Sequence, residues 1–580
     1  MSTSLQARIP NSPPWARWRA ITLATAFALI VAACQAAPVA TPTTAPTGAP
    51  TTDAPPTDAP ATDAPTAEPT QSGEMTVLTA AWTDFGQMDF STAGAGGDTE
   101  KIMLQIQEPL TTVDPETFEV VGHLAESFEL SDDELTWTFR LRPGIPFHDD
   151  WGTVTAEDVK YTWEQWMVDE SLHGRRDQVR RIVGEDPNNV QVVDELTVTI
   201  TSPTPQVDLP GFLTPYALGM AIDSKRYHDE MGDEANLHPI GTGPWEFVSA
   251  IPDEEVVLDA VQNHWYRTPG FDRLVLKLID DGAARLLQTQ SGDVDITFLD
   301  SDLIGEAEAA GLQLIPVAAT ANTFLVLGGS YFSNPDSLDV DSPWIQADNP
   351  EQGLAIRRAM SHAIDRQVIL DTILGGYGQL SRGPLIEFPN VPALTDPSWD
   401  VPAFDQDLAR QLLTEGGYPD GFELEFFQYP DDIDTVSVGE AIAGMWEEVG
   451  LTVNRTPGEE DLLEAREDEL NTGGTVWVKL AGYNVEPASR LSSYWSGNDV
   501  GLPMTHPAID EAYESMALEA DLDARFAIAR DLIATLRDEV IGIPLFASDS
   551  LFMAGPRVGS YDPMPGIKDM YNLDTIQPAD

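Results

Sequence analysis

Cysteine is almost absent from this sequence: Cys34 is the single one among 580 residues. One thiol excludes an internal disulfide and every metal site that needs two or more cysteine ligands. Basic residues are also scarce, because 31 Lys and Arg stand against 95 Asp and Glu, and the formal net charge is -64. A field of this sign repels phosphate backbones. We therefore expect no nucleic-acid partner.

Motifs of catalysis and cofactor binding are missing as well. The eight histidines form no HExxH pair, and the sequence contains neither a GxSxG nucleophile elbow nor a GxxxxGK[ST] phosphate loop. The stretch GTGPWE at Gly241 lacks the third glycine of a dinucleotide loop, and the acidic run from Asp431 to Asp434 lacks calcium-loop spacing. We expect no enzyme activity, no metal site and no cofactor. Carboxylates are too plentiful for a glycosidase pair to be recognised, so an anchored extracellular hydrolase stays open as an alternative.

The N-terminus has the order of a secretory signal. Residues 1–52 contain no acidic residue, and three arginines precede an apolar segment of about 14 residues, Ala20 to Ala33. A membrane-spanning helix needs about 20 apolar residues. The small residues before Cys34 resemble the lipobox of bacterial lipoproteins, in which the cysteine takes a lipid and becomes the first mature residue. This predicts a signal peptide over 1–33 and a lipid anchor at Cys34; plain cleavage or a retained anchor are the alternatives.

A repetitive Thr, Pro, Ala and Asp segment follows Cys34, with DAP at residues 53, 58 and 63. It has almost no large apolar side chains, and its prolines favour extended conformations. We interpret residues 34–73 as the lipid-anchor cysteine followed by a spacer that leads to a folded body.

From residue 74 onward, strand patterns alternate with helical ones. Short apolar strands are predicted at 75–82, 135–142, 196–201, 255–261, 273–279, 293–299 and 322–329. Thr155 and Asp158 have capping-box spacing at the start of one helix, and apolar residues at helical spacing predict another over 354–374. This alternation is typical of α/β lobes.

Several segments of the body resemble one family. They are HLAESFELSDDELTWTFRLRPGIPFHDDWGTVTAEDVKYTWE (123–164), PIGTGPWEF (239–247), GLAIRRAMSHAIDRQVI (353–369), ARQLLTEGGYPDGF (409–422) and IPLFASD (543–549). Together they resemble solute-binding protein family 5 of ABC importers, whose members include oligopeptide-, dipeptide- and nickel-binding proteins. The resemblance covers about residues 75–571.

The resemblance implies a two-lobed clamp of the periplasmic-binding-protein kind (type II, cluster C) with an extra subdomain in the first lobe. The first lobe would comprise 74–112, 238–322 and 545–580, with the subdomain at 113–237, and the second lobe would comprise 323–544. The chain would cross between lobes near Thr323 and return near Leu545. Ligand would lie between the lobes, and hinge closure would bury it.

Aromatic and polar residues near the expected lobe edges are the candidate ligand contacts, because clamps hold polar solutes with aromatic faces and a few hydrogen-bonding groups. Core packing is the alternative for each aromatic residue. The candidates are Trp82, Asn322, Tyr377, Trp477, Lys479, Tyr483, Asn484, Trp495 and Phe546.

The segment around Tyr483 departs from the pattern of the peptide-binding members. In those members an aspartate shortly before an acidic-Pro pair meets the amino terminus of the peptide. Here the pair is Glu486-Pro487, and the preceding positions 482–485 carry no carboxylate. An ammonium buried without a counter-charge is costly. Free peptides are therefore less favoured unless Glu486 takes this role, an oligosaccharide is the rival ligand, and a carboxylate at Lys479 is a further alternative.

The resemblance implies further partners and a location. We expect a monomer on the extracytoplasmic face of the cell membrane that passes a small solute, a peptide or an oligosaccharide, to an ABC permease. A sensor subunit would use the same fold, and a neighbouring permease gene would separate the two.

Overall fold

The computed structural model describes residues 75–94, 98–168, 171–173, 176–216, 219–389, 391–429, 434–483, 486–497 and 502–580. The predicted signal peptide, Cys34 and the spacer lie outside these residues, as does Asn484. The described residues all belong to one compact unit.

Among the described residues, eleven strands form the central sheet. Its order is β15 (Thr452–Pro457), β14 (Glu423–Gln428), β16 (Thr475–Gly482), β12 (Gln313–Leu327), β17 (Ile543–Ala554), β11 (Ile296–Phe298), β1 (Val77–Trp82), β10 (Arg273–Leu278), β9 (Glu255–Ala260) and β8 (Trp245–Ile251), with β13 (Gly378–Leu380) paired to β17.

The long strands β12 and β17 connect the two halves of this sheet. They pair antiparallel along most of their length, and the register shifts between Val317 and Ala321. We call the half with β1 and β8 to β11 the first lobe, and the half with β14 to β16 the second lobe. The register shift lies close to the predicted crossing at Thr323; the exact domain boundaries stay a prediction.

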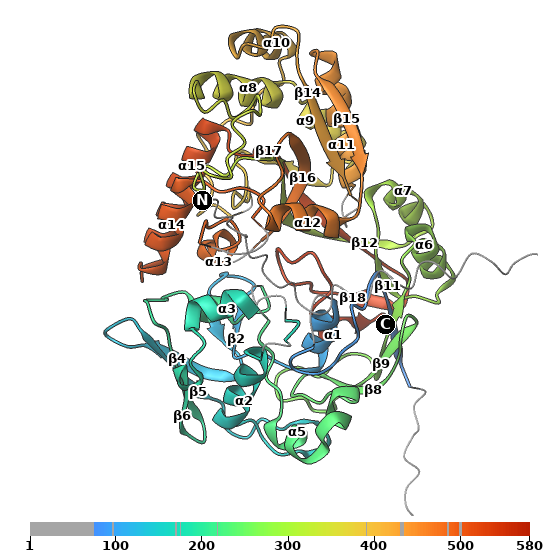
Figure 1. Ribbon diagram of the computed structural model, residues 1–580. Coiled ribbons are helices and arrows are strands. Elements are labelled where there is room, and N and C mark those ends of the chain that lie inside the picture. The colour runs from blue at the N-terminus through green and yellow to red at the C-terminus, as the bar shows by residue number, and fades with distance from the viewer. Residues whose placement is uncertain are drawn as a thin grey trace, which may run out of the picture. The chain divides into compact units, whose positions relative to one another are not determined.

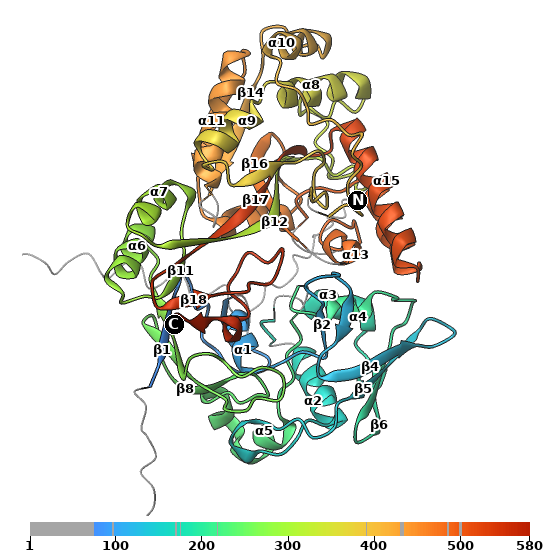
Figure 2. The ribbon, with the colours of Figure 1, turned by 180° about the vertical axis from the view of Figure 1, so that it is seen from behind.

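Helices cover both lobes. Figures 1 and 2 show α8 to α11 around β14 to β16, α2 and α5 at the opposite end of the unit, and α1 nearer its middle. The helices are α1 (Asp98–Ile106), α2 (Ala156–Trp166), α3 (Arg176–Val183), α4 (Leu209–Phe212), α5 (Lys225–Met231), α6 (Gly282–Ser291), α7 (Ser301–Ala309), α8 (Pro350–His362), α9 (Arg366–Thr372), α10 (Gln406–Glu415), α11 (Thr435–Glu448), α12 (Glu460–Asp468), α13 (Pro487–Leu491), α14 (Pro507–Ala517) and α15 (Leu522–Glu539).

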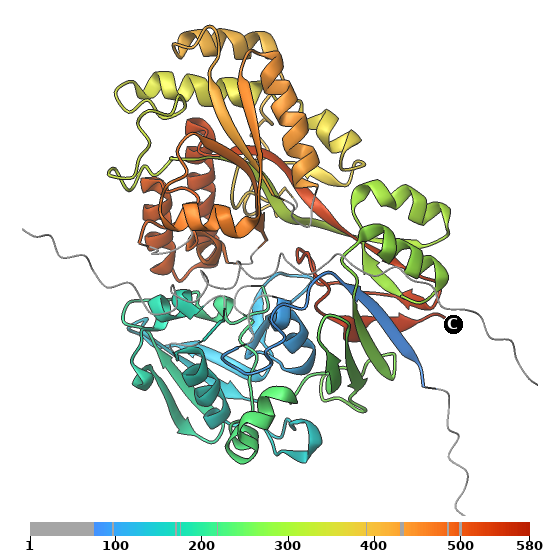
Figure 3. The same cartoon turned by 45° about the vertical axis from the view of Figure 1, so that its right-hand side comes forward.

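A separate sheet marks the extra subdomain. Its strands follow the order β4 (Ala125–Leu130), β5 (Thr136–Leu141), β7 (Thr197–Thr201) and β6 (Val190–Asp194), and they are coloured cyan to teal in Figure 3. Buried Trp163 and Trp166 of α2 pack in a core cluster of this region, which is distinct from the clusters of the lobes. Two further pairs are β2 (Thr111–Val113) with β3 (Val120–Gly122), and β18 (Val558–Ser560) with β19 (Gln577–Pro578).

Local sequence signals explain most of these elements, with one correction. The capping box of Thr155 and Asp158 at the start of α2 is confirmed. The single helix predicted over 354–374 is wrong, because the chain forms α8 and α9 with a break after His362. The carboxylate of Asp365 accepts the backbone N–H of Val368 at 3.1 Å and so starts a new helix. A side-chain cap outweighs the continuous apolar pattern here.

Candidate functional site

A cavity of about 530 Å³ is lined by residues of both lobes. The second lobe contributes Lys479 from β16 and Tyr483 directly after it, and β12 contributes Thr320 at the crossing. Helix α1, the segment after α4 and the C-terminal segment 566–571 supply the opposite wall. The first and second lobes therefore meet around one polar space.

The charge of this cavity differs from that of the whole chain. Acidic residues outnumber basic ones 95 to 31 in the sequence. Among the described residues that line the cavity, both signs are equally frequent. The cations are Lys101, Lys479, Arg490 and Lys568, and the acids are Asp98, Glu100, Glu460 and Asp569. The cavity is consequently far less repulsive to an anionic group than the surrounding protein.

On the first-lobe wall, Lys101 lies between two carboxylates. Its ammonium forms ion pairs with Asp98, one turn earlier on α1, and with Asp569 at 3.1 Å. Burial alone lowers the pKa of Lys101, but Asp569 and Asp98 outweigh it and hold the pKa above the usual lysine value. Burial also raises the pKa of Asp98, against the opposing effect of Lys101. This wall thus carries a closely coupled charge cluster with an excess carboxylate.

On the second-lobe wall, Lys479 has a weaker partner. Its Nζ lies 3.8 Å from Oε1 of Glu467, which is too long for a hydrogen bond. Among the described residues, no side-chain hydrogen bond of Lys479 is found, and Oε1 of buried Glu467 has no hydrogen-bonding partner. Burial raises the pKa of Glu467 to about 7, although Lys479 opposes the shift. The ammonium of Lys479 therefore keeps its donor capacity beside the cavity.

Tyrosine is the prevailing aromatic residue of the cavity wall. Of the described residues that line it, four are tyrosines: Tyr216, Tyr429, Tyr483 and Tyr571. Tyr483 packs edge-on against Tyr216 of the first lobe, with ring centroids 6.1 Å apart. Gly566 approaches the same ring so closely that an added Cβ would lie 2.5 Å from Tyr483 Cδ1. Tyr483 is thus a contact point between the lobes.

The other predicted contacts do not line this cavity. Trp82 lines a pocket of about 40 Å³ that shares Lys101 and Asp569 with the cavity, and Tyr377 lines a pocket of about 20 Å³ near Asp549. Trp495 packs against Tyr513 at a centroid distance of 5.1 Å. Of the predicted contacts that the structure describes, only Lys479 and Tyr483 line the cavity.

Three predicted contacts are completely buried. Trp477 and Phe546 lie in the hydrophobic core, each 0 % exposed. The amide of Asn322, also 0 % exposed, donates to Ser381 Oγ at 3.0 Å and to the carbonyl of Gly383 at 3.2 Å. All three side chains are closed off from solvent, and their role in ligand contact stays a prediction.

Glu486 is engaged elsewhere. Its Oε1 lies 3.0 Å from Nη2 of Arg525, and both side chains are buried. Asp208, which precedes α4 in the subdomain, is buried beside this pair, and its Oδ1 has no hydrogen-bonding partner among the described residues. Burial, and then the charge of Glu486, raise the pKa of Asp208 to about 7 against the opposing charge of Arg525. This cluster joins the subdomain to α13 and α15 of the second lobe.

Sequence reasoning missed the first-lobe half of the cavity. Asp98 and Lys101 have ordinary i, i+3 spacing on α1, which a solvent-exposed helix would also show. Asp569 reaches them from 468 residues further along the chain. In the fold, α1 follows β1, and β1 and the late strand β17 both pair with β11. Local sequence patterns carry no signal for such a contact.

Within the described ranges, no cluster of three or more His, Cys, Asp or Glu side chains is arranged to hold a metal ion. The helices of those same ranges are all too short or too polar to cross a membrane.

The chain is similar in sequence to known proteins. The model of the bacterial extracellular solute-binding proteins, family 5 (Middle), matches residues 119–501. The chain is 25% identical over 475 residues to heme-binding protein A of Haemophilus influenzae, covering 76% of this chain and 81% of that protein. It is also 25% identical over 405 residues to the dipeptide-binding protein of Escherichia coli, covering 66% and 71%.

Solved structures share the fold. The periplasmic binding protein DppA from Helicobacter pylori, in complex with the peptide STSA, superimposes with a TM-score of 0.69 at 20% identity, over 87% of this chain and 98% of that one. A two-lobed α/β clamp with a mixed sheet is therefore the fold of this chain. Because the family model covers most of the body as well, the chain belongs to family 5 of the bacterial extracellular solute-binding proteins.

Proposed function

We propose that this protein is the lipid-anchored solute-binding component of an ABC importer, and that it encloses a peptide or a similar polar organic solute in the cavity between its lobes. Lys479 carries the proposal. Its ammonium lines the cavity, and the one ion pair it makes with the residues that the structure describes is the 3.8 Å contact with Glu467, so it can bind a carboxylate or carbonyl oxygen of a ligand.

The carboxylates of the opposite wall support a zwitterionic ligand such as a peptide. Glu486 is paired with Arg525 and does not line the cavity, so it is not placed to meet an amino terminus. On this wall the three carboxylates of Asp98, Glu100 and Asp569 outnumber the ammonium groups of Lys101 and Lys568, which leaves an excess negative charge for a ligand ammonium. The similarity to the dipeptide-binding protein of Escherichia coli supports this choice.

An oligosaccharide is the second candidate. Four tyrosines line the cavity, and aromatic faces with hydroxyl groups suit both the apolar and the polar sides of a sugar.

Native mass spectrometry of the protein purified from its own host would test the proposal by identifying the bound solute. Thermal-shift screens of peptides and oligosaccharides should then show stabilisation by one class. Absence of stabilisation by any solute in well-folded protein would contradict the proposal. Consumption of a solute during incubation would instead support an anchored hydrolase.

Substitution of Lys479 tests the contact directly. Lys479→Met should weaken binding of the identified solute about tenfold or more, because a hydrogen bond to a charged group contributes about 1.5–3 kcal/mol. Lys160→Met is the matched control, since Lys160 has a similarly long ion pair of 3.9 Å with Glu164 on α2. Equal affinities of both variants in calorimetry would remove Lys479 from the site.

The anchor needs its own experiment. Cys34→Ala should release the protein from the membrane fraction, because a lipidated cysteine is the proposed attachment point and residues 35–73 only the spacer. Fractionation followed by immunoblotting measures this, and a variant that stays membrane-bound would favour the retained apolar segment 20–33 as the anchor.

A further inference from the structure

A second pocket opens beside the cavity in the first lobe. It has a volume of about 170 Å³, and Pro215, Tyr216 and Tyr571 line both spaces. Since the same side chains form part of both walls, the two spaces are neighbouring compartments. None of the candidate contacts predicted from the sequence lines this side pocket.

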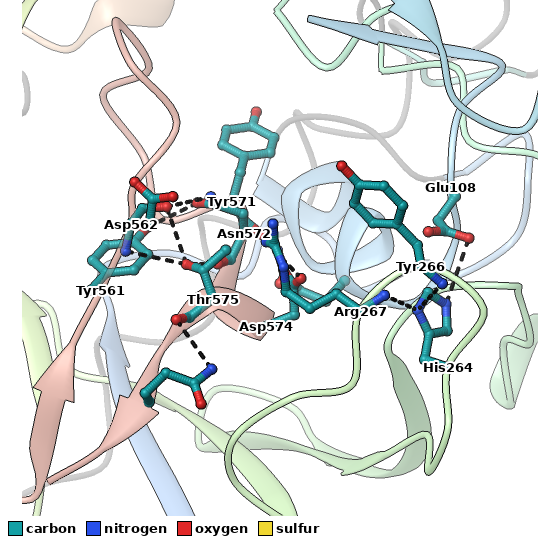
Figure 4. Close-up of polar contacts among 12 residues, drawn as sticks. Glu108, His264, Tyr266, Arg267, Tyr561, Asp562, Tyr571, Asn572, Asp574 and Thr575 are labelled. Atoms are coloured by element: carbon teal, nitrogen blue, oxygen red, sulfur yellow. Dashed lines mark hydrogen bonds and ion pairs between the residues drawn. The ribbon is translucent and has the colours of Figure 1, made fainter. Parts of the chain in front are cut away.

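The loop at one edge of the side pocket is held rigidly. His264 donates its Nε2–H to the carbonyl of Thr242 at 2.7 Å, and its Nδ1 accepts the backbone N–H of Arg267 at 3.2 Å. The neighbouring Trp265 donates to the buried carboxylate of Glu108 at 2.7 Å. These contacts fix residues 264–267, and Figure 4 shows Tyr266 and Tyr571 extending on either side of Arg267.

Tyr266 is exposed although its position is fixed. Its ring packs edge-on against His123 with centroids 5.0 Å apart, and yet 59% of the residue is exposed. The guanidinium of Arg267 lies 5.7 Å from the same ring centroid, and its Nη1 lies 3.2 Å from Asp574. Holding an aromatic ring in place while leaving it open to water favours stacking with a bound group.

Most of the wall surface is apolar, and the charge balance of the lining residues is negative. Six prolines line the pocket with Leu104, Val113 and Met564, which gives rigid surfaces without backbone donors: Pro109, Pro115, Pro215, Pro244, Pro563 and Pro565. The carboxylates of Glu108, Asp562 and Asp574 outnumber the one guanidinium of Arg267. An anionic group is disfavoured in these surroundings, whereas an uncharged ring or apolar chain fits them.

We propose that the side pocket is a second compartment of the ligand site and receives an uncharged aromatic or apolar end group of the solute whose polar part occupies the cavity. This proposal depends on the proposed function only for where the polar part of the solute binds. The solute is then elongated, with charged groups at Lys479 and the α1 wall and a neutral group against Tyr266 and Tyr571.

Binding of a small aromatic probe tests the pocket independently of the natural solute. Fluorine NMR relaxation of 4-fluorophenol should show saturable binding to the full chain, and the anion 4-fluorobenzoate should bind more weakly. Tyr266→Ala should weaken 4-fluorophenol about fivefold, in keeping with the energy of an aromatic pair. Phe404→Ala is the matched control, because Phe404 is an exposed aromatic residue that does not line the pocket and should leave binding unchanged.

A second variant closes the pocket. Thr112 lines it and is only partly buried, so Thr112→Trp should fill the space without disturbing the core and should abolish saturable binding. The proposal is overturned if 4-fluorophenol binds to the unaltered protein without saturation, or if Thr112→Trp binds it equally well. Binding of peptides in the cavity would not rescue it. If 4-fluorophenol binds saturably to the unaltered protein and this binding is lost in Thr112→Trp, the result supports the compartment. This holds even if no peptide or oligosaccharide binds, a result that would refute the proposed function alone.

Discussion

Replacing Asp208 with asparagine should make the stability of the folded protein less dependent on pH. Asp208 is 2 % exposed, and its pKa rises from 3.8 to about 7 because it is buried and then because Glu486 lies nearby, while Arg525 opposes the shift. Tyr513 and Arg181 are also near this cluster. The folded state therefore binds the proton of Asp208 more tightly than the unfolded chain does.

This difference in proton affinity fixes the direction and the size of the change in stability with pH. The stabilisation by the bound proton is complete below about pH 4 and is lost as the pH rises through about 7. At about 1.4 kcal/mol per pKa unit, the two units between pH 5 and 7 correspond to about 3 kcal/mol. An asparagine side chain cannot ionise, so the stability advantage of Asp208→Asn should grow by up to about 3 kcal/mol from pH 5 to pH 8.

Urea unfolding at pH 5, 6, 7 and 8 measures the free energy of unfolding of Asp208→Asn and of the unaltered protein. Asp348→Asn is the control, because Asp348 is exposed and its replacement should change stability equally at each pH. An advantage of Asp208→Asn that stays constant from pH 5 to 8, or one that matches the control, would refute a buried and protonated Asp208.

The remaining predictions concern other contacts. Thr155→Ala should lower the free energy of unfolding by about 1 kcal/mol, because it removes the capping box of α2; an unchanged urea midpoint would argue against the cap. Glu467→Gln should stabilise the protein above pH 7, since burial raises the pKa of Glu467 to about 7 and the glutamine cannot ionise; equal stability with the unaltered protein at pH 8 would contradict this. Tyr483→Ala should weaken solute binding, because it removes a ring that lines the cavity and contacts the first lobe, and calorimetry that finds unchanged affinity would exclude that role.

Elements with strong local signals could be predicted from the sequence. Apolar runs predicted β1, β5, β7, β9 and β10, and the capping residues predicted α2. The one wrong helix, over 354–374, shows the limit of this approach. An apolar stripe reports which face is buried, but it does not reveal that Asp365 caps a new helix inside the stripe.

The candidate site was only partly predictable, for a geometric reason. On β16, Trp477 and Lys479 are two residues apart and share one face of the strand, yet Trp477 is completely buried and Lys479 lines the cavity. Alternation specifies the face of a strand, whereas the position along the strand relative to the lobe edge decides whether a side chain meets core or cavity. That position depends on how β12 and β17 cross between the lobes.

The sequence by itself determined the class of the protein: α/β lobes, a charge of -64 that disfavours nucleic acid, and the segments that resemble family 5. Only the tertiary structure decided which charges face the solute. Asp98 and Lys101 on α1 meet Asp569 near the C-terminus, and Arg525 on α15 takes Glu486 away from the cavity. Charges far apart in the chain acquire their partners through the packing of whole elements, and composition and spacing do not encode which elements meet.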